Sequence, residues 1–219
     1  MLEGQKEKII DLLKSTNRDG MDKLIDWLEQ EGFFTCPAST KYHGCFEGGL
    51  AKHSLGVYDL LMEFAKGMNL GAVTSPGQNP HTLNDDNFII AALLHDVCKV
   101  GAYIGTEKPY KWNKQQPKGH ATLSIARIEQ FIKLEPIEEM AIRFHMGFYG
   151  LNEFYKKGDW QTGEYPLRGD HIACEGMSKE ESKKVRYGKS MANAWFHNPV
   201  CKAIYFCDEL ETLQAKAAE

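Results

Sequence analysis

The amino-acid sequence predicts an all-α protein. Apolar residues recur at the 3.6-residue spacing of a helix in successive stretches, as in residues 9–13 and 21–28. The stretch FIIAALLHDVCKV is apolar nearly all round, which is typical of a central, buried helix. No run of three strand-like segments interrupts this pattern. We therefore expect helices packed around one buried helix.

Residues typical of helix starts and helix ends indicate the limits of the expected helices. Residues 84–86, Asn-Asp-Asp, offer short side-chain oxygens that accept the free backbone N–H groups at a helix start. Gly101 provides the usual left-handed end, so the central helix is expected between these two limits. Gly32 ends the second helix and is followed by a loop over residues 33–49. Further helices are expected at residues 49–66, 120–133 and 136–145 and after Pro199.

Two interruptions of the helical pattern are expected to carry function. Residues 102–118 are aromatic and polar and contain Pro109 and Pro117, which fits a small hairpin or a long loop. Residues 146–188 are rich in glycine and are expected to form a long irregular insertion. A loop of that length in a compact domain is usually a lid or a substrate-binding segment.

Composition excludes several classes of protein. The 219 residues are 42% hydrophobic and 26% charged, a balance typical of one soluble globular domain. It excludes a disordered chain, collagen, a coiled coil and a secreted mini-protein. The six cysteines form no CxxC pair and are expected to be reduced thiols. The net charge of −4 argues against a surface coated by nucleic acid but leaves room for a local basic groove.

No membrane association is expected. The longest apolar run, residues 88–94, is far shorter than the about 20 residues of a membrane span. The N-terminal stretch MLEGQKEKIIDLL is charged and lacks the apolar core of a signal peptide. These features predict a cytoplasmic protein.

The polar residues on apolar helix faces suggest a metal site. His53 lies among leucines and valines, and His95 follows four apolar residues with Asp96 beside it. Asp208 follows another apolar stretch. Burying such groups is costly unless a strong charge compensates, and a divalent metal supplies one. The alternatives are a hydrogen-bonded His95–Asp96 pair and histidines that simply pack or face solvent.

Two further histidines, His120 and His145, belong to otherwise apolar helices. The full series is His53, His95-Asp96, His120, His145 and Asp208, and each member has apolar neighbours in the sequence. Such a series rarely arises by chance, and it favours a shared metal site. For the histidines at 81, 171 and 197, which lie in loops or near helix breaks, we expect no special role.

The order of these residues, with HDxxK at residues 95–99, resembles the HD-domain superfamily of metal-dependent phosphohydrolases. The resemblance covers roughly residues 33–213. The motifs FTCPAST (34–40), GGLAKHS (48–54), ALLHD (92–96) and GH (119–120) are similar to the subgroup that contains the bacterial HD-domain 3′→5′ exoribonucleases and their phage-like relatives. Two departures are HDVCK in place of the common HDIGK, and His145-Met146 in place of a pair of histidines.

The resemblance implies an HD-domain helical bundle and a set of metal ligands. We expect a single HD domain over residues 1–219, with residues 1–32 as an N-terminal helical extension and residues 33–213 as the core. On the family pattern, His53, His95, Asp96 and Asp208 hold one divalent metal ion. Members with a second ion use Asp96 as the bridge and add His120 and His145. Whether one or two ions bind stays open, and Mn, Fe, Co, Ni, Zn and Mg all suit such ligands.

Three residues are expected to take part in catalysis. Asp96 holds the metal, and Lys99, three residues later, is expected to bind phosphate or to offset charge in the transition state. The alternative for Lys99 is a lysine that extends into solvent at a helix end. His43 is a candidate proton donor or support for a metal ligand, and simple loop packing is its alternative.

The expected function is hydrolysis of a phosphate ester by metal-activated water. Aromatic and lysine residues interleave in residues 103–118 and again in residues 149–186, which suits a nucleotide or single-stranded nucleic acid. The RNA-cutting relatives usually carry an N-terminal oligonucleotide-binding barrel, whereas residues 1–32 are expected to be helical, so a small phosphoester stays open. The alternative is a catalytically inactive, metal-stabilised HD module that binds nucleotides or a protein partner. The oligomeric state is left open.

Overall fold

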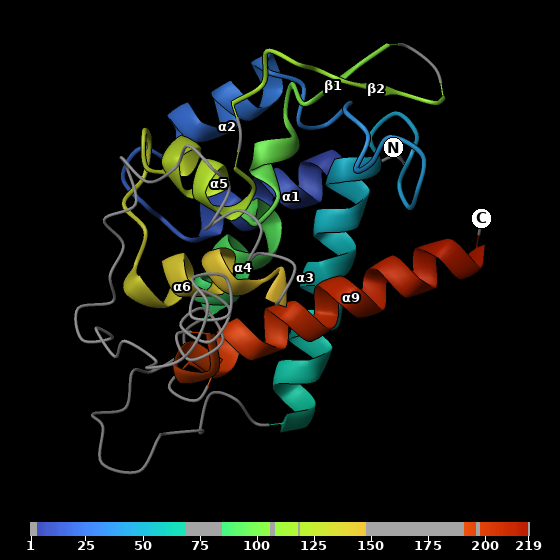
Figure 1. The fold of residues 1–219 in the computed structure, drawn as a ribbon. Coiled ribbons are helices and arrows are strands. Elements are labelled where there is room, and N and C mark those ends of the chain that lie inside the picture. Colours follow the sequence, from blue (N-terminus) through green and yellow to red (C-terminus); the bar gives the residue numbers. More distant parts are fainter. Residues whose placement is uncertain are drawn as a thin grey trace, which may run out of the picture.

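The computed structural model describes residues 4–68, 85–105, 108–117, 119–147, 191–195 and 198–218. Over these residues the protein is mostly helical, with one two-stranded hairpin, so the predicted all-α class is confirmed (Figure 1). The helices are α1 (Gln5–Ser15), α2 (Met21–Gln30), α3 (Gly49–Met68), α4 (Asp85–Leu94), α5 (Ala121–Ile128), α6 (Pro136–Phe144) and α9 (Pro199–Ala218). A 3₁₀ helix, η2 (Val97–Lys99), follows α4.

Helix α4 is the central helix, as its sequence predicts. All its residues from Asn87 to Leu94 are buried. One side of α4 packs with α1, α2, α5 and the start of α3 in one hydrophobic cluster. The other side packs with the end of α3, α6 and α9 in a second cluster. Because both sides are covered, every position of α4 from Phe88 to Leu94 is apolar, and this part of the helix has no polar stripe.

Helix α9 brings the end of the chain back to the middle of the bundle. It packs against α3 and α6 and crosses α3 in Figure 1. Its buried positions, Val200, Ala203, Ile204 and Cys207, recur at helical spacing and join the second cluster. This packing positions Asp208, the next residue, at the centre of the molecule.

The central helix ends earlier than the sequence suggests. An α-helix up to Gly101 was expected, but α4 ends at Leu94, and a turn at residues 95–96 leads into η2. Side chains outside the helix stabilise this ending. The Arg127 guanidinium donates to the carbonyl oxygens of Val97, Cys98 and Val100 at 2.9, 3.1 and 2.8 Å. The expected helix at 120–133 is likewise shorter, since α5 ends at Ile128.

The loop between α2 and α3 is folded closely onto the start of α3. The Gly48 and Leu50 N–H groups donate to the carbonyl oxygens of Thr35 and Cys36 at 2.8 and 3.1 Å. A Cβ atom at Gly49 would lie 1.9 Å from the Gly44 carbonyl oxygen, so only glycine fits there. This close approach fixes the position of His43, which precedes Gly44.

The hairpin expected within residues 102–118 is present. Strand β1 (Tyr103–Ile104) pairs antiparallel with β2 (Lys111–Trp112). The Tyr110 N–H donates to the Thr40 carbonyl oxygen at 3.2 Å, and the Tyr103 hydroxyl donates to the Ala38 carbonyl oxygen at 3.2 Å. The hairpin is therefore attached to the loop that carries His43.

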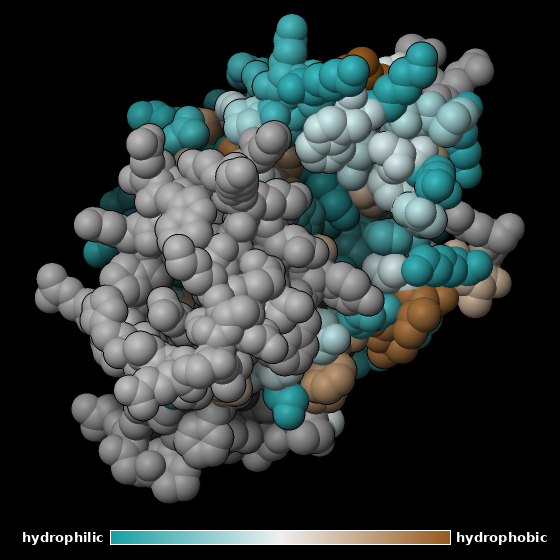
Figure 2. Space-filling view, viewed as in Figure 1, coloured by the Kyte–Doolittle hydropathy of each residue, from teal (hydrophilic) through white to brown (hydrophobic). Residues whose placement is uncertain are grey.

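Some of the other predictions concern residues that only partly lie within the described ranges. Of the expected insertion at 146–188, residues 148–188 lie outside the described part of the chain. Cysteines 36, 45, 98, 201 and 207 are free thiols. Within the described ranges, none of the helices combines the length and the apolar character needed to cross a bilayer. Figure 2 shows a mainly hydrophilic described surface with a hydrophobic patch over α9, which exposes Phe206, Leu210 and Leu213.

Candidate metal centre

Six predicted site residues converge from five segments of the chain. His53 lies in α3, and Asp208 lies in α9. His95 and Asp96 occupy the turn after α4, where the chain leaves the helix axis. His120 directly precedes α5, and His145 directly follows α6, so both lie at the helix ends that the expected ranges gave. Rings of successive histidines in the series 53, 95, 145 and 120 have centroids 4.9–5.3 Å apart.

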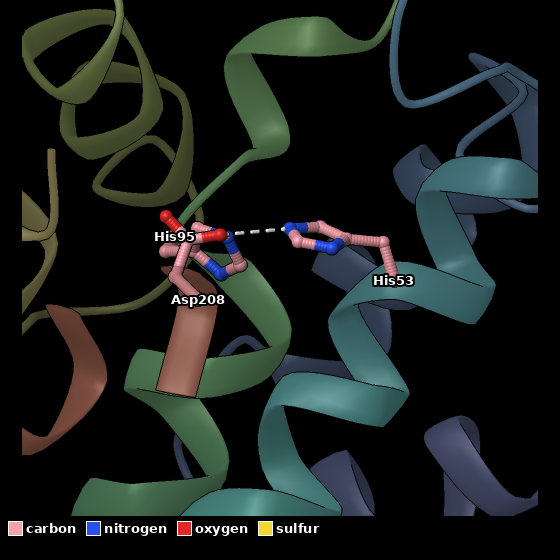
Figure 3. Close-up of side chains that lie close together, drawn as sticks. All are labelled: His53, His95 and Asp208. Carbon is pink, nitrogen blue, oxygen red and sulfur yellow. Dashed lines mark ion pairs between the residues drawn. The ribbon is translucent and has the colours of Figure 1, made fainter. Parts of the chain in front are cut away.

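The first group of side chains consists of His53, His95 and Asp208. The Asp208 Oδ1 atom lies 3.1 Å from His53 Nε2 and 3.9 Å from His95 Nε2. Figure 3 shows the imidazole of His53 directed from α3 toward Asp208 and His95. Donor atoms about 2.0–2.2 Å from one ion are themselves roughly 3–3.5 Å apart. These separations therefore suit a shared cation.

The Asp96 carboxylate faces two sets of histidines. Its Oδ2 atom lies 3.4 Å from His95 Nε2 and 3.6 Å from His53 Nε2. Its Oδ1 atom lies 2.7 Å from His120 Nε2 and 3.7 Å from His145 Nε2. The two oxygens of one carboxylate thus point toward different imidazole pairs. This is the arrangement that a carboxylate bridging two ions requires.

The hydrogen bonds on the far side of each ring direct the Nε2 atoms toward the centre. His95 Nδ1 donates to the Ala92 carbonyl oxygen at 2.8 Å, and His145 Nδ1 donates to the Ile142 carbonyl oxygen at 2.6 Å. Because a carbonyl only accepts, each Nδ1 carries a proton, and Nε2 is the nitrogen left to offer a lone pair to a cation. Metal-binding histidines are usually held in this way.

Several of these inward atoms have no hydrogen bond of normal geometry within the described part of the chain. They are buried and include Nε2 of His53, His95 and His145 and Oδ1 of Asp96. Buried polar atoms without partners are costly, and cations that accept these lone pairs, one on each side of Asp96, would satisfy them. The donor set of imidazole nitrogens and carboxylate oxygens suits a borderline or hard divalent ion. The residues present therefore fit a metal centre.

The charges of the site reinforce one another. Burial alone would raise the pKa of Asp96, but Lys99, His95 and His120 hold that pKa well below its usual range. Burial likewise opposes ionisation of Asp208, yet contact with His53 and the charge of His95 lower the pKa of Asp208. Both carboxylates are thus negatively charged at neutral pH, as metal ligands must be.

Lys99 belongs to the same cluster. Its Nζ atom lies 2.5 Å from Asp96 Oδ2, and its side chain is 14% exposed. Burial would lower the pKa of Lys99, but Asp96 outweighs that effect and raises it. The alternative of a lysine that extends into solvent is wrong, and Lys99 supplies a fixed positive charge beside the centre. Its contact with phosphate stays a prediction.

His43 lies at the edge of the cluster and not within it. Its ring centroid is 5.3 Å from that of His53, and its Nε2 atom is 3.5 Å from the Thr212 hydroxyl. Burial, with the neighbouring His53, lowers the pKa of His43 to about 4. The ring is therefore neutral at pH 7, and its catalytic role stays a prediction.

Two neighbours of the site were not predicted from the sequence. Glu211 contacts His53 Nδ1, and Cys98 Sγ lies 3.0 Å from His120 Nδ1. Glu211 is three residues after Asp208 on one helix, and this spacing is the signal that could have found it. The sequence marked Cys98 as a departure from the HDIGK motif and as a thiol too deep in an apolar helix to act as a nucleophile. In the structure, Asp96, Cys98 and His120 offer three possible ligand atoms within reach of one another.

Comparison with family models identifies the family to which the chain belongs. Residues 50–174, more than half of the chain, match the model of the HD domain, so the chain belongs to the HD domain family. Members of this family are generally metal-dependent phosphohydrolases. The matched segment contains His53, His95, Asp96, Lys99, His120 and His145, whereas Asp208 and His43 lie outside it. Comparisons with curated proteins and with solved structures found no match.

Proposed function

We propose that the protein hydrolyses a phosphate ester of a nucleotide or of single-stranded nucleic acid, with a divalent metal centre held by His53, His95, Asp96, Asp208, His120 and His145. The observation that supports this proposal best is that the two carboxylate oxygens of Asp96 face different pairs of histidines. Oδ2 faces His53 and His95, and Oδ1 faces His120 and His145. This geometry favours two ions over one.

The protein side chains supply binding, orientation and charge. Bound in this centre, a divalent cation supplies water of lowered pKa and positive charge beside the phosphoryl oxygens. The carbonyl partners of His95 and His145 keep those rings oriented before substrate arrives. Lys99 adds a positive charge that is held by Asp96 and does not have to reorganise during the reaction.

Two observations support a role for His43 in transferring a proton or orienting a ligand: its ring lies beside that of His53, and it is neutral at pH 7. Its Nδ1 atom is buried and has no hydrogen-bond partner within the described residues. A substrate oxygen that reached this nitrogen would complete its hydrogen bonding. For this reason we keep His43 as a catalytic candidate beside Asp96 and Lys99.

The substrate class is proposed from the surface beside the centre. The hairpin and the loop joined to it expose Trp112 and Tyr42, at 52% and 58% of their surface. Lys41 lies over the Tyr42 ring, 5.2 Å from its centroid, and Lys111 is exposed beside Trp112. Aromatic rings stack on bases while lysines meet phosphates. These features favour a nucleotide or a single strand as the substrate, and the motif resemblance to the exoribonuclease-like subgroup supports the same choice.

The test is a substrate screen with the metal-loaded protein. Chromogenic phosphate monoesters and diesters, nucleotides, cyclic nucleotides and short RNA or DNA oligomers are incubated with the protein and Mn²⁺. We expect hydrolysis that a chelator stops. Asp96→Asn should reduce the rate by more than the ~100-fold typical of residues that only support a ligand. Asp26→Asn, at an exposed position in α2, is the matched control and should retain full activity.

Two results would contradict the proposal. Metal binding without cleavage of any of these esters would favour the inactive module that binds nucleotides or a protein partner. Equal activity of Asp96→Asn and the wild-type chain would show that the reaction does not use this centre.

A further inference from the structure

We infer that Glu211 is a positioning residue for the metal centre, that it fixes the imidazole of His53, and that Gly56 provides the space it needs. This inference rests on the proposed metal centre. It concerns residues of α9 and α3 that are not themselves expected to bind the ion.

His53 differs from His95 and His145 in the group that contacts its Nδ1 atom. His95 and His145 lie at the ends of helices, where the carbonyl three residues earlier can accept the Nδ1 proton. His53 lies within α3, whose carbonyls are engaged in the helix itself. Its Nδ1 atom instead contacts the Oε2 atom of Glu211, which lies 158 residues away along the chain.

One turn of α9 thus contacts both nitrogens of one imidazole. Asp208 Oδ1 lies 3.1 Å from His53 Nε2, and Glu211, three residues later, contacts Nδ1. The exposed fractions of the side chains are 2% for His53 and 13% for Glu211. A carboxylate on Nδ1 holds a proton there, so Nε2 is the nitrogen that gives up its proton and offers its lone pair when a cation binds. It also increases the electron-donating strength of the ring.

The glycine at position 56 is a second observation that supports the role of Glu211. It lies inside α3, where glycine is less favourable than alanine. Its φ is not positive, so the backbone conformation does not explain the glycine. A Cβ atom at this position would lie 2.9 Å from Cγ and 3.4 Å from Cδ of Glu211. The missing side chain therefore makes room for the carboxylate that reaches His53.

The experiment measures metal affinity in the full-length protein. Glu211→Gln keeps the size of the side chain but removes its charge, and Gly56→Ala displaces the carboxylate without changing its chemistry. Glu209→Gln, on the exposed side of α9, is the charge-matched control. Gly67→Ala is the matched control in α3, because a Cβ atom there meets nothing within 4 Å. The dissociation constant for Zn²⁺ is measured by competition with a chromogenic chelator, and the Co²⁺ absorption spectrum reports the ligand environment.

We expect Glu211→Gln and Gly56→Ala each to weaken Zn²⁺ binding about 10- to 100-fold and to alter the Co²⁺ spectrum. The two controls should bind like the wild-type chain. If Gly56 acts through Glu211, the double variant should bind Zn²⁺ only slightly more weakly than the weaker-binding single variant, because the two changes remove the same interaction. Circular dichroism and thermal unfolding without metal verify that each variant is folded.

The outcomes separate this inference from the proposed function. A wild-type chain that binds neither Zn²⁺ nor Co²⁺ would overturn the metal centre itself. A wild-type chain that binds tightly, with folded Glu211→Gln and Glu209→Gln variants of equal affinity, would overturn the role of Glu211 alone. Additive losses in the double variant would overturn the role assigned to Gly56.

Discussion

His53 is a residue at which a proton and a metal ion compete directly. Burial alone would lower the pKa of His53, but contact with the carboxylates of Asp208 and Glu211 raises it to about 9. The metal-free ring therefore carries protons on both nitrogens at neutral pH. A cation can bind Nε2 only after that proton has left.

We accordingly predict that metal affinity rises with pH. Below a pKa of about 9, binding releases the His53 proton, so the association constant should increase by at least about tenfold per pH unit. Above that pKa the ring is already neutral, and its contribution to the slope should vanish. Isothermal titration with Mn²⁺ in buffers of different ionisation enthalpy measures both the affinity and the protons released. An affinity that is constant from about pH 7 to about pH 9 would contradict this prediction.

At the scale of single residues, the sequence was most informative where polarity and burial conflict. His53, His95 and Asp208 could be identified because a charged or polar residue in an apolar helix needs a reason. Glu211 and Cys98 could not be identified in this way. They support the rings of His53 and His120, and this role depends on helices that meet only in the folded chain.

At the scale of elements, the end of α4 is the clearest failure of sequence reasoning. Helical periodicity and Gly101 predicted one helix through His95 and Asp96, whereas the chain turns there. The competing interactions come from elsewhere in the sequence. Ser124 Oγ accepts the Cys98 N–H at 3.0 Å, and Arg127 binds three carbonyl oxygens of the turn. Local propensity contains no information about such partners.

Arg127 is therefore predicted to stabilise the turn that carries Asp96 and Lys99. Arg127→Met keeps the apolar stem of the side chain but leaves the Val97 carbonyl without its guanidinium donor. We expect a loss of about 1–3 kcal/mol in the free energy of unfolding, since buried polar groups are costly to leave unpaired. Urea denaturation measures this loss, and hydrogen exchange should show faster opening of the segment around Cys98.

The control for this prediction is Lys23→Met, which removes an exposed cation from α2. Its effect should lie within about 0.5 kcal/mol of zero. Equal stability of the Arg127 and Lys23 variants would mean that other donors, such as Gln116, whose Nε2 lies 2.8 Å from the Cys98 carbonyl oxygen, hold the turn without Arg127.

At the scale of the whole molecule, the sequence predicted the bundle but not the way its helices meet. The central position of α4 follows from its apolar sequence, and the positions of α3, α6 and α9 around it do not. The set of distant residues that form the site was predicted more fully. The order of the family motifs assigned Asp208 and His53 to one site although they lie far apart in the sequence. The family match ends at residue 174, yet the geometry includes Asp208 in the cluster.

This separation leads to a prediction about stability. A metal ion held by residues of α3, α9 and the ends of α4, α5 and α6 joins segments that are far apart in the unfolded chain. An ion that binds only the folded state adds about 2.7 kcal/mol of stability at a concentration 100 times its dissociation constant. For a chain of this size, that corresponds to a rise in Tm of roughly 5–10 °C.

Differential scanning calorimetry with and without Mn²⁺ measures this shift, and a chelator should reverse it. Asp208→Asn removes the link between α9 and α3 and should lose most of the metal-dependent rise in Tm, whereas Asp26→Asn should keep it. Because both variants remove one carboxylate, a difference between them cannot come from net charge. An equal rise in both variants would show that the ion binds elsewhere.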